Sequence, residues 1–236
     1  MINYAKFKIT KRTALNSENL VLFRLRPIKE IDFQSGDLMS ISPQGYKSPR
    51  LYYIGRLGKE ILISIQWYPN GICSSYLCSL NVGDTIQGII KKNHQFHFPK
   101  KATSVWYIAD GNGIVPYLGF AIENHKTDLK LIWEGKTESS FDYYRKVLED
   151  TPSLGKNINY ELAFSECNKK KNVQKILLKH QIKVAETIKN GGVFMLCGSE
   201  KMQYSVLDTL EEITNKYLLK PLRQFQDSGK IITNCY

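Results

Sequence analysis

The stretch "YIADGNGIVPYLGF", residues 107–120, decides how the second half of this chain is interpreted. An apolar run ends at Asp110, glycines flank Asn112, and a proline follows three residues after the second glycine. Glycines at such a point let the backbone approach a ligand closely, and the helix start that follows offers amides to a pyrophosphate. The stretch begins like the G-x-G-x-x-G fingerprint but has proline where the third glycine belongs. Alone, it is also compatible with a plain turn between a strand and a helix.

Outward from this loop, apolar strands alternate with helix-compatible stretches. The expected strands are "SVWYIA", "LKLIWEG", "NYELAF" and "VFMLC". The expected helices are "PYLGFAIENH", "SSFDYYRKVLED", "VQKILLKHQIKVAETIKN" and residues 202–217. This alternation predicts an α/β domain with a parallel sheet over residues 101–236. Ligands of such sheets bind at the carboxyl ends of the strands, where "DGNG" and "CGS" fall.

The first hundred residues have a different rhythm. The expected strands are "KFKITKR", "NLVLFRLRP", "RLYYIGRL", "EILISIQWY" and "NVGDTIQGII", and turn segments separate them. Closely spaced short strands with turns between them are typical of a barrel or a sandwich. We therefore predict a two-domain chain, with a β domain over residues 1–100 followed by the α/β domain.

The net charge of +11 is concentrated in the first domain. Residues 1–100 contain 14 Lys or Arg and 6 Asp or Glu, a balance of +8, whereas residues 101–236 contain 19 and 16, a balance of +3. A basic surface is compatible with nucleic acid, an anionic membrane or an acidic protein. The basic residues are dispersed and accompany no nucleic-acid-binding motif, which favours an acidic protein or simple solubility.

Several functional classes are disfavoured by the sequence. No apolar stretch is long enough to span a bilayer, and "MINYAKFKITKRTAL" lacks the apolar centre of a secretory signal, so we expect a cytoplasmic protein. The five cysteines include no CxxC pair, which argues against a disulfide framework or a metal site. Cys73 and Cys78 have the spacing of one iron–sulfur motif, but the cysteine pair that should follow is missing.

Two segments of the first domain carry residues suited to a phosphate and a flat ring. In "SPRLYYIG", strand alternation puts Arg50, Tyr52 and Ile54 on one face, and Leu51 and Tyr53 on the other. An arginine can bind a phosphate with two hydrogen bonds, and a fixed tyrosine can stack on a ring. The segment "NGICSSYL" offers serines and a helix start for a second phosphate contact. The alternatives are an exposed arginine beside a core tyrosine, and a serine-rich turn.

In "CGSEKM", Cys197 is expected at the end of a strand, facing the ligand crevice. Because four of its five preceding residues are apolar, a buried structural cysteine is the competing interpretation.

The motifs occur in one order along the chain: R-x-Y, G-x-C-S-x-Y-L, G-x-G-I-x-P-Y, C-G and a terminal aromatic residue. In this order, over roughly residues 5–236, the sequence resembles the ferredoxin–NADP reductase family, which includes the flavoprotein reductase domains of sulfite reductase and cytochrome P450 reductase. The resemblance implies an FAD-binding antiparallel β-barrel of Greek-key type, followed by an NAD(P)-binding α/β domain with a parallel sheet.

For the flavin, the resemblance implies roles for residues of both barrel motifs. Arg50 matches the arginine that holds the flavin pyrophosphate, and Tyr52 matches the tyrosine that stacks on the isoalloxazine ring. Tyr53 stands where the family usually has a serine that hydrogen-bonds flavin N5. The second phosphate segment is matched by Gly71, Ile72, Cys73 and Ser74.

For the nicotinamide nucleotide, the matching loop is the one quoted first. Gly111, Gly113 and Pro116 match the family's GTGIAPF-like loop, and Asn112 replaces its threonine while keeping a side-chain donor. The pair beside the nicotinamide is matched by Cys197 and Gly198, and the terminal aromatic that covers the flavin by Tyr236. The residues expected beside the reacting rings are therefore Tyr52, Tyr53, Cys197 and Tyr236.

The segment "AFSECNKKKNVQ" resembles the one that reads the 2′-phosphate of NADPH. Its serine, lysine and glutamine are matched by Ser165, Lys170 and Gln174. Its arginine is replaced by Glu166, which would repel a phosphate, while the lysines at 169–171 would attract one. We expect NADPH to be preferred, with NADH possible, because losing a bidentate arginine weakens phosphate recognition without abolishing it.

The implied function is an FAD-dependent oxidoreductase that passes electrons from NAD(P)H through flavin to a small carrier such as ferredoxin or flavodoxin. The basic first domain suits an acidic carrier. The alternative is a flavin-free or catalytically degenerate binding module on the same scaffold, since several family positions are changed. Nucleic-acid binding is a third alternative, without a motif to support it.

Overall fold

The structure is a computed structural model that describes residues 4–15, 19–43, 45–46, 48–124, 127–150, 159–165 and 172–235, with Leu15 described by its backbone alone. The chain divides into two compact units. The first comprises Met1–Phe98 and Val115–Phe120, and the second comprises Pro99–Ile114 and Ala121–Tyr236. The assignment of residues 1–100 and 101–236 to two cofactors stays a prediction.

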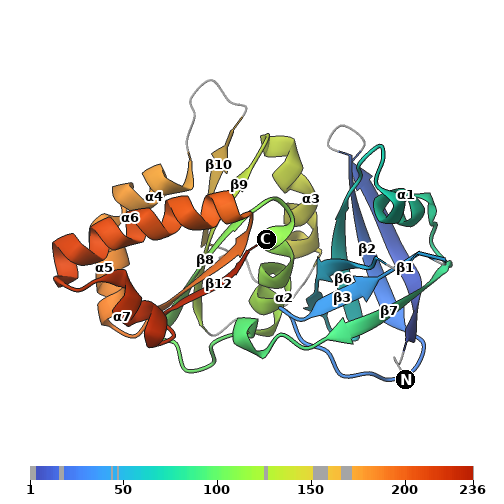
Figure 1. Ribbon diagram of the computed structural model, residues 1–236, viewed down its shortest axis with the longest axis horizontal. Helices are drawn as coiled ribbons and strands as arrows, with labels where there is room; N and C mark the ends of the chain where they lie inside the picture. Colours follow the sequence, from blue (N-terminus) through green and yellow to red (C-terminus); the bar gives the residue numbers. More distant parts are fainter. Residues whose placement is uncertain are drawn as a thin grey trace. The chain divides into compact units, whose positions relative to one another are not determined.

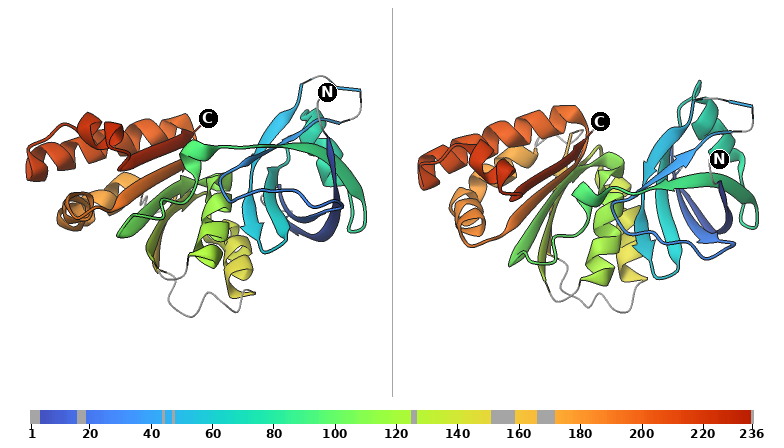
Figure 2. Two further views of the ribbon diagram at one scale, coloured as in Figure 1. Left: turned by 90° about the horizontal axis from the view of Figure 1, so that it is seen from below. Right: turned by 60° about the horizontal axis from the view of Figure 1, so that its bottom comes forward.

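The first unit is built on one antiparallel sheet with the strand order β4-β3-β7-β1-β2-β6-β5 (Figure 1). Its strands are β1 (Ala5–Leu15), β2 (Leu20–Pro27), β3 (Leu38–Ile41), β4 (Arg50–Tyr53), β5 (Gly55–Leu57), β6 (Glu60–Gln66) and β7 (Thr85–Lys91). The strands β4 and β5 stand at opposite ends of this order, yet only Ile54 separates them in the chain. The sheet therefore curls into the near-closed antiparallel barrel that the sequence predicts (Figure 2).

The barrel interior is filled by every second residue of its strands, as expected for a sheet with one face on a core. From three strands, the members of this core are Phe7 and Ile9 of β1, Val21, Phe23 and Leu25 of β2, and Ile61, Ile63 and Ile65 of β6. On the other face, Leu22 and Leu62 are buried as well. The helix α1 (Ile72–Ser79) adds Cys73 and Leu77 to the same core. The short 3-10 turn η2 (His94–Phe96) buries Phe96.

The strand predicted over "RLYYIGRL" is two strands, because the chain breaks at Ile54. The amide of Ile54 donates to the carbonyl oxygen of Asp37 at 3.0 Å, and the amide of Gly36 donates back to Ile54 at 3.0 Å. This pairing with the turn before β3 takes Ile54 out of the ladder. The strand β3 itself is missing from the sequence prediction, because four residues are too few to show a clear alternation.

The second unit contains a parallel sheet with the strand order β10-β9-β8-β11-β12 (Figure 1). Its strands are β8 (Ser104–Asp110), β9 (Asp128–Gly135), β10 (Asn159–Phe164), β11 (Val193–Gly198) and β12 (Ile231–Cys235). Its helices are α3 (Glu138–Glu149), α4 (Val173–Lys179), α5 (Gln181–Lys189), α6 (Glu200–Leu218) and α7 (Leu222–Asp227). The helix α2 (Val115–Glu123) follows the 3-10 turn η3 (Gly111–Ile114) and divides between the two units after Phe120. The predicted parallel α/β sheet is thus confirmed.

The second unit departs from the sequence prediction in two places. The helix predicted over residues 173–190 is two helices that meet at His180, whose ring nitrogen Nε2 lies 2.6 Å from Glu161 Oε1. The helix α7 and the strand β12 are additional elements. The run "IITNC" of β12 is short and follows a helix, so the sequence alone did not mark it as part of the sheet. Within the described parts of the chain, no helix combines the length and apolar composition needed to cross a bilayer.

Candidate functional site

The two flavin-related motifs of the first unit come together at β4 and α1. The phenol of Tyr52 donates to Cys73 Sγ at 3.4 Å, and this thiol donates to the carbonyl oxygen of Ile41 at 3.7 Å. Arg50 lies at the exposed start of β4. Burial raises the pKa of the Cys73 thiol, and the nearby Arg50 charge partly opposes that rise. We call Arg50, Tyr52 and Cys73 the flavin cluster.

The side chains around the flavin cluster differ in how far they reach solvent. Tyr52 is half-buried, and this burial, together with its hydrogen bond to Cys73, raises the pKa of its phenol, which therefore stays neutral in the physiological range. Tyr53 is buried with 6% of its surface exposed, whereas Leu51 is 49% exposed. Strand alternation predicted that Leu51 and Tyr53 share one face of the strand. Their exposure shows that this face is buried at Tyr53 and open to solvent at Leu51. Ile72 is exposed.

The start of α1 has amides available ahead of its first helical hydrogen bond, which runs from Ser75 N to the carbonyl oxygen of Gly71 at 2.8 Å. The Ser74 hydroxyl donates to Gly71 O at 3.0 Å and accepts from Tyr68 N at 3.2 Å. A Cβ on Gly71 would lie 2.4 Å from Ser74 Oγ. The buried hydroxyl therefore holds the turn together, and a phosphate here would meet backbone amides.

In the second unit, the dinucleotide loop, Gly111–Ile114, is tied down through the carbonyl groups of both glycines. The indole Nε1 of Trp133 donates to Gly111 O at 2.9 Å. The phenol of Tyr107 donates to Gly113 O at 2.8 Å. Gly111 has a φ of +47°, in the left-handed region that favours glycine. With their carbonyl groups held by side chains, the two glycines keep a fixed peptide orientation.

The residue between the glycines is held as well. Tyr144 of α3 donates from its phenol to Asn112 Oδ1 at 3.1 Å. The sequence suggested that Asn112 would serve as a donor, and the structure assigns its side-chain oxygen to Tyr144. Pro116 is buried in the first turn of α2, where its missing amide costs little.

The dinucleotide loop packs closely on the end of β11. A Cβ on Gly113 would lie 2.1 Å from the carbonyl oxygen of Cys197, so only glycine fits there. Cys197 itself has no exposed surface. This burial agrees with the structural interpretation of that cysteine, and its role beside a nicotinamide stays a prediction. Gly198 has a φ of +145°, and a Cβ there would collide with Asp110 Oδ1.

Asp110 joins the ends of β8 and β11 through its carboxylate. Its Oδ1 accepts from Ser199 N at 2.8 Å, and its Oδ2 accepts from the Ser199 hydroxyl. Ser199 is also the N-cap of α6, where its Oγ accepts from Met202 N at 3.2 Å. Burial first, and the Asp110 charge second, raise the pKa of the neighbouring Cys235 thiol to about 11. This thiol is therefore neutral at physiological pH.

Of the residues predicted to read the adenosine end, Ser165 directly follows β10 and Gln174 lies in α4. The exposed Ser165 donates from its amide to the carbonyl oxygen of Gly135 at 3.0 Å. Gln174 is half-buried in the first turn of α4, and the amide of its neighbour Val173 donates to Glu134 Oε2 at 3.1 Å. The predictions for Lys170 and Tyr236 fall outside the described residues.

Sequence reasoning missed the residues that hold the site in place. Asp110 carried a signal, because it ends a strand at the ligand-binding edge directly before the glycine loop. Tyr107 and Trp133 lie within apolar strands, and Tyr144 falls on the buried face of a helix, so their pattern predicted only core positions. Their polar atoms become informative only when the fold brings them to the loop.

No protein-family model matches the sequence. The chain is 32% identical over 162 residues to the NADPH–cytochrome P450 reductase of Dictyostelium discoideum. It is 26% identical over 217 residues to the root ferredoxin–NADP reductase isozyme 2 of Arabidopsis thaliana, and 30% identical over 159 residues to the sulfite reductase (NADPH) flavoprotein alpha-component of Bacillus subtilis. These alignments cover 62%, 84% and 62% of this chain, but only 24%, 54% and 26% of the relatives.

The fold is shared with solved structures over nearly the whole chain. The ferredoxin–NADP+ reductase of Plasmodium falciparum, solved with 2′P-AMP, has a TM-score of 0.75 at 20% identity and matches 99% of this chain and 96% of its own. A flavohemoglobin of Malassezia yamatoensis with bound FAD and heme has a TM-score of 0.75 at 16% identity, over 99% and 60%. Similarity at this level of identity shows the fold. Together with the sequence matches it confirms the resemblance seen in the motifs: the homologues of this chain include a ferredoxin–NADP reductase, a cytochrome P450 reductase and a sulfite reductase flavoprotein.

Proposed function

We propose that this chain is an FAD-dependent oxidoreductase that takes electrons from NADPH and passes them to a small carrier protein. The proposal rests on one observation: a single chain carries both the flavin cluster and the dinucleotide loop, each in its own unit. The dinucleotide loop follows β8, where the strand order of the parallel sheet reverses. Two of the relatives carry NADPH and reductase in their names, and one of these two is called a flavoprotein, which supports the same reaction class.

The first unit has the donors that FAD needs. Arg50 is exposed and can bind a pyrophosphate with two hydrogen bonds, and the amides at the start of α1 can take a second phosphate oxygen. Tyr52 offers an aromatic ring whose phenol is already anchored to Cys73. In this role Tyr52 orients the flavin by its ring, and the neutral phenol places no charge beside it.

The second unit fits a dinucleotide. The dinucleotide loop presents backbone amides where the strand order reverses. Hydrogen bonds hold its residues Gly111, Asn112 and Gly113, so these residues do not cover the amides. Bound FAD would supply the redox chemistry, which is the conversion of a two-electron hydride donor into a one-electron donor. The chain contributes binding and alignment: Gly111 and Gly113 allow the pyrophosphate to approach, and Cys197 with Gly198 forms the wall proposed to face the nicotinamide.

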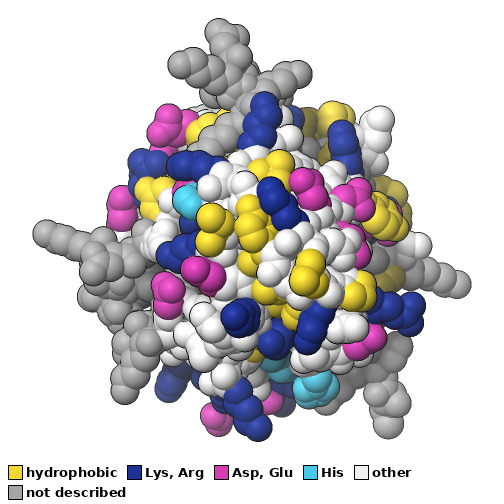
Figure 3. Space-filling model, turned by 90° about the vertical axis from the view of Figure 1, so that its left-hand side faces the viewer, with side chains coloured by type: hydrophobic (Ala, Val, Ile, Leu, Met, Phe, Trp, Pro, Cys, Tyr) yellow, Lys and Arg dark blue, Asp and Glu magenta, His cyan; other side chains and the backbone are white. Residues whose placement is uncertain are grey.

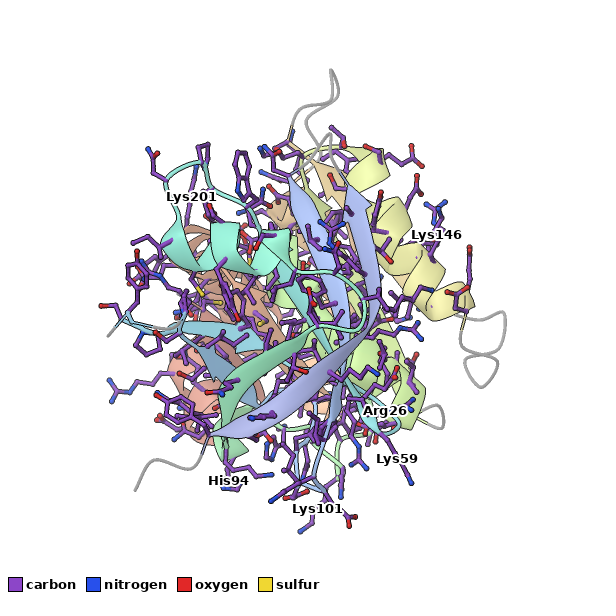
Figure 4. The ribbon with its side chains drawn as sticks, turned by 90° about the vertical axis from the view of Figure 1, so that its right-hand side faces the viewer. Arg26, Lys59, His94, Lys101, Lys146 and Lys201 are labelled. Carbon is purple, nitrogen blue, oxygen red and sulfur yellow. The ribbon has the colours of Figure 1, made fainter. Side chains whose placement is uncertain are left out.

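For the carrier, the charge distribution supports an acidic protein that docks through the first unit. The labelled Lys59 lies exposed on the barrel, and the largely exposed Arg26 beside it pairs with Glu60 at 2.9 Å (Figure 4). On the face of the second unit that carries α5, α6 and α7, basic and acidic side chains are interspersed with hydrophobic ones (Figure 3). Raising the salt concentration should slow reduction of an acidic carrier more than reduction of a small neutral dye, because steering by charge is screened. An equal effect on both would count against this docking.

The visible absorption spectrum of the purified chain tests the proposed function directly. A yellow protein, or a colourless one that turns yellow on addition of FAD and is bleached by NADPH without oxygen, is the expected result. A chain that takes up no FAD would instead support the flavin-free binding module. Stopped-flow rates of flavin reduction by NADPH and NADH then measure the nucleotide preference, and equal rates and affinities would contradict a preference for NADPH.

A further inference from the structure

The strand order of the second unit indicates where the adenosine ribose of a dinucleotide is recognised. If the strands of this unit are numbered 1 to 5 along the chain, the order β10-β9-β8-β11-β12 becomes 3-2-1-4-5. The dinucleotide loop follows the first of these strands, β8. In doubly wound folds of this order, an acidic residue about twenty positions beyond the glycine loop binds the ribose 2′-hydroxyl of NAD, whereas an arginine accommodates the 2′-phosphate of NADP. In this chain Glu134 stands at that place, near the carboxyl end of β9.

The structure fixes the Glu134 carboxylate at the ligand edge of the sheet. In the ladder, Glu134 is the register partner of Asp110 on one side and of Ala163 on the other. Its Oε2 accepts from Val173 N at 3.1 Å. The next residue, Gly135, accepts from the amide of Ser165 at 3.0 Å. Glu134 therefore lies among the segments predicted to read the adenosine end, and its negative charge is part of their surface.

The chemistry of this corner favours a hydroxyl over a phosphate. A carboxylate repels a 2′-phosphate and accepts a hydrogen bond from a ribose hydroxyl. A ribose 2′-hydroxyl can donate to the Glu134 carboxylate, whereas a phosphate offers chiefly acceptors of its own.

We infer that Glu134 is a specificity-determining residue of the nucleotide site, whose carboxylate lowers the preference for NADPH and lets the chain accept NADH. This inference deepens the function proposed above and rests on it. It assigns the effect to one charge, so removing that charge while keeping its hydrogen bond must shift the preference toward NADPH.

The test is Glu134→Gln, because the glutamine oxygen can still accept from Val173 N while the negative charge is lost. The ratio of kcat/KM for NADPH to that for NADH should rise about ten-fold, mainly through a lower KM for NADPH. The inhibition constant of 2′-phospho-AMP should fall by a similar factor, with that of AMP unchanged or higher. Glu134→Ser gives a second variant that lacks the charge, and Glu149→Gln, an exposed position on α3, is the matched control.

The outcomes separate this inference from the proposed function. An unchanged nucleotide ratio in a folded Glu134→Gln chain, even with lower activity toward both nucleotides, would overturn the role of Glu134, because a purely structural residue affects both alike. If the unmodified chain binds no FAD, the proposed function fails, and calorimetric binding of 2′-phospho-AMP and AMP to the same variants still decides the inference. Binding of neither nucleotide fragment would overturn it as well.

Discussion

The flavin cluster and the dinucleotide loop are held by different means. In the flavin cluster, one phenol–thiol hydrogen bond of 3.4 Å joins β4 to α1, and the charged Arg50 is exposed. In the dinucleotide loop, three side-chain donors at 2.8, 2.9 and 3.1 Å fix three successive residues. The backbone of the loop also presses against Cys197. One region is loosely held and the other is rigid.

The proposed function gives a reason for this difference, in what each region would offer a ligand. A long arginine side chain finds its phosphate by changing rotamer, so its support need not be exact. Backbone amides cannot adjust in that way, and a site that uses them has to be built in the bound geometry. Substitutions in the dinucleotide loop should therefore act by displacing atoms, and substitutions in the flavin cluster by deleting contacts.

The largest effect is expected from Gly113→Ala. A Cβ at this position would lie 2.1 Å from the carbonyl oxygen of Cys197, so the loop must move. A displacement of about 1 Å can cost on the order of 100-fold in rate, and we expect at least that loss in kcat/KM for NADPH. FAD content, read from the absorption spectrum, should not change. Gly58→Ala, with a positive φ but open space around it, controls for backbone strain alone. A mild loss in both variants would show that the loop is not rigid.

Arg50→Ala should have the next largest effect, and on the other cofactor. Losing the charged hydrogen bonds to a phosphate should weaken FAD binding by roughly 10- to 100-fold, measured as the dissociation constant for FAD added to apoprotein. With saturating FAD, the KM for NADPH should stay the same. Arg223→Ala, on the exposed surface of α7, is the control. An unchanged FAD affinity would show that Arg50 does not bind a phosphate of FAD.

Asp110→Asn tests the junction between the dinucleotide loop and the start of α6. The carboxylate accepts two hydrogen bonds from Ser199, and an amide would leave the Ser199 hydroxyl without its acceptor. We expect about a ten-fold loss in kcat/KM for NADPH, the size of one charge-assisted hydrogen bond. Ser199→Ala should lower kcat/KM for NADPH less when it is added to Asp110→Asn than when it is made alone. The reason is that both substitutions remove the same hydrogen bond. If the two losses simply add, Asp110 and Ser199 act independently of each other.

The sequence predicted the two sheets and the loop because their signals are local. The nearly continuous apolar run "ILISI" marks β6, and the unbroken apolar run "VFMLC" marks the fully buried β11. The pairing of Asp110 with Ser199 joins residues 89 positions apart, and no local pattern encodes it. The same holds for Trp133 and Gly111. The residues that sequence reasoning proposed for ligand contacts stay predictions, and what it missed were the side chains that hold the loop in place.

Tyr144→Phe should have a smaller effect that is confined to the second unit. The substitution removes only the phenol that donates to Asn112 Oδ1 and leaves the ring in the core. One neutral hydrogen bond contributes about 1 kcal/mol, so the KM for NADPH should rise roughly five-fold with kcat nearly constant. Tyr143→Phe, the half-buried neighbour on α3, is the control. A fall in kcat alone would mean that Tyr144 does not act through nucleotide binding.

Tyr52→Phe is the matched deletion in the flavin cluster, and we expect the smallest effect. The phenol gives its proton to a sulfur atom, which is a weak acceptor, and the ring that would stack on the flavin is kept. The FAD dissociation constant should therefore change about two-fold or less, since a hydrogen bond to sulfur is worth less than an ordinary one. Tyr144→Phe and Tyr52→Phe each remove one hydroxyl group, so their effects can be compared directly. If Tyr52→Phe weakens FAD binding more than Tyr144→Phe weakens NADPH binding, the flavin cluster is the more rigid of the two regions, which would contradict the order inferred above.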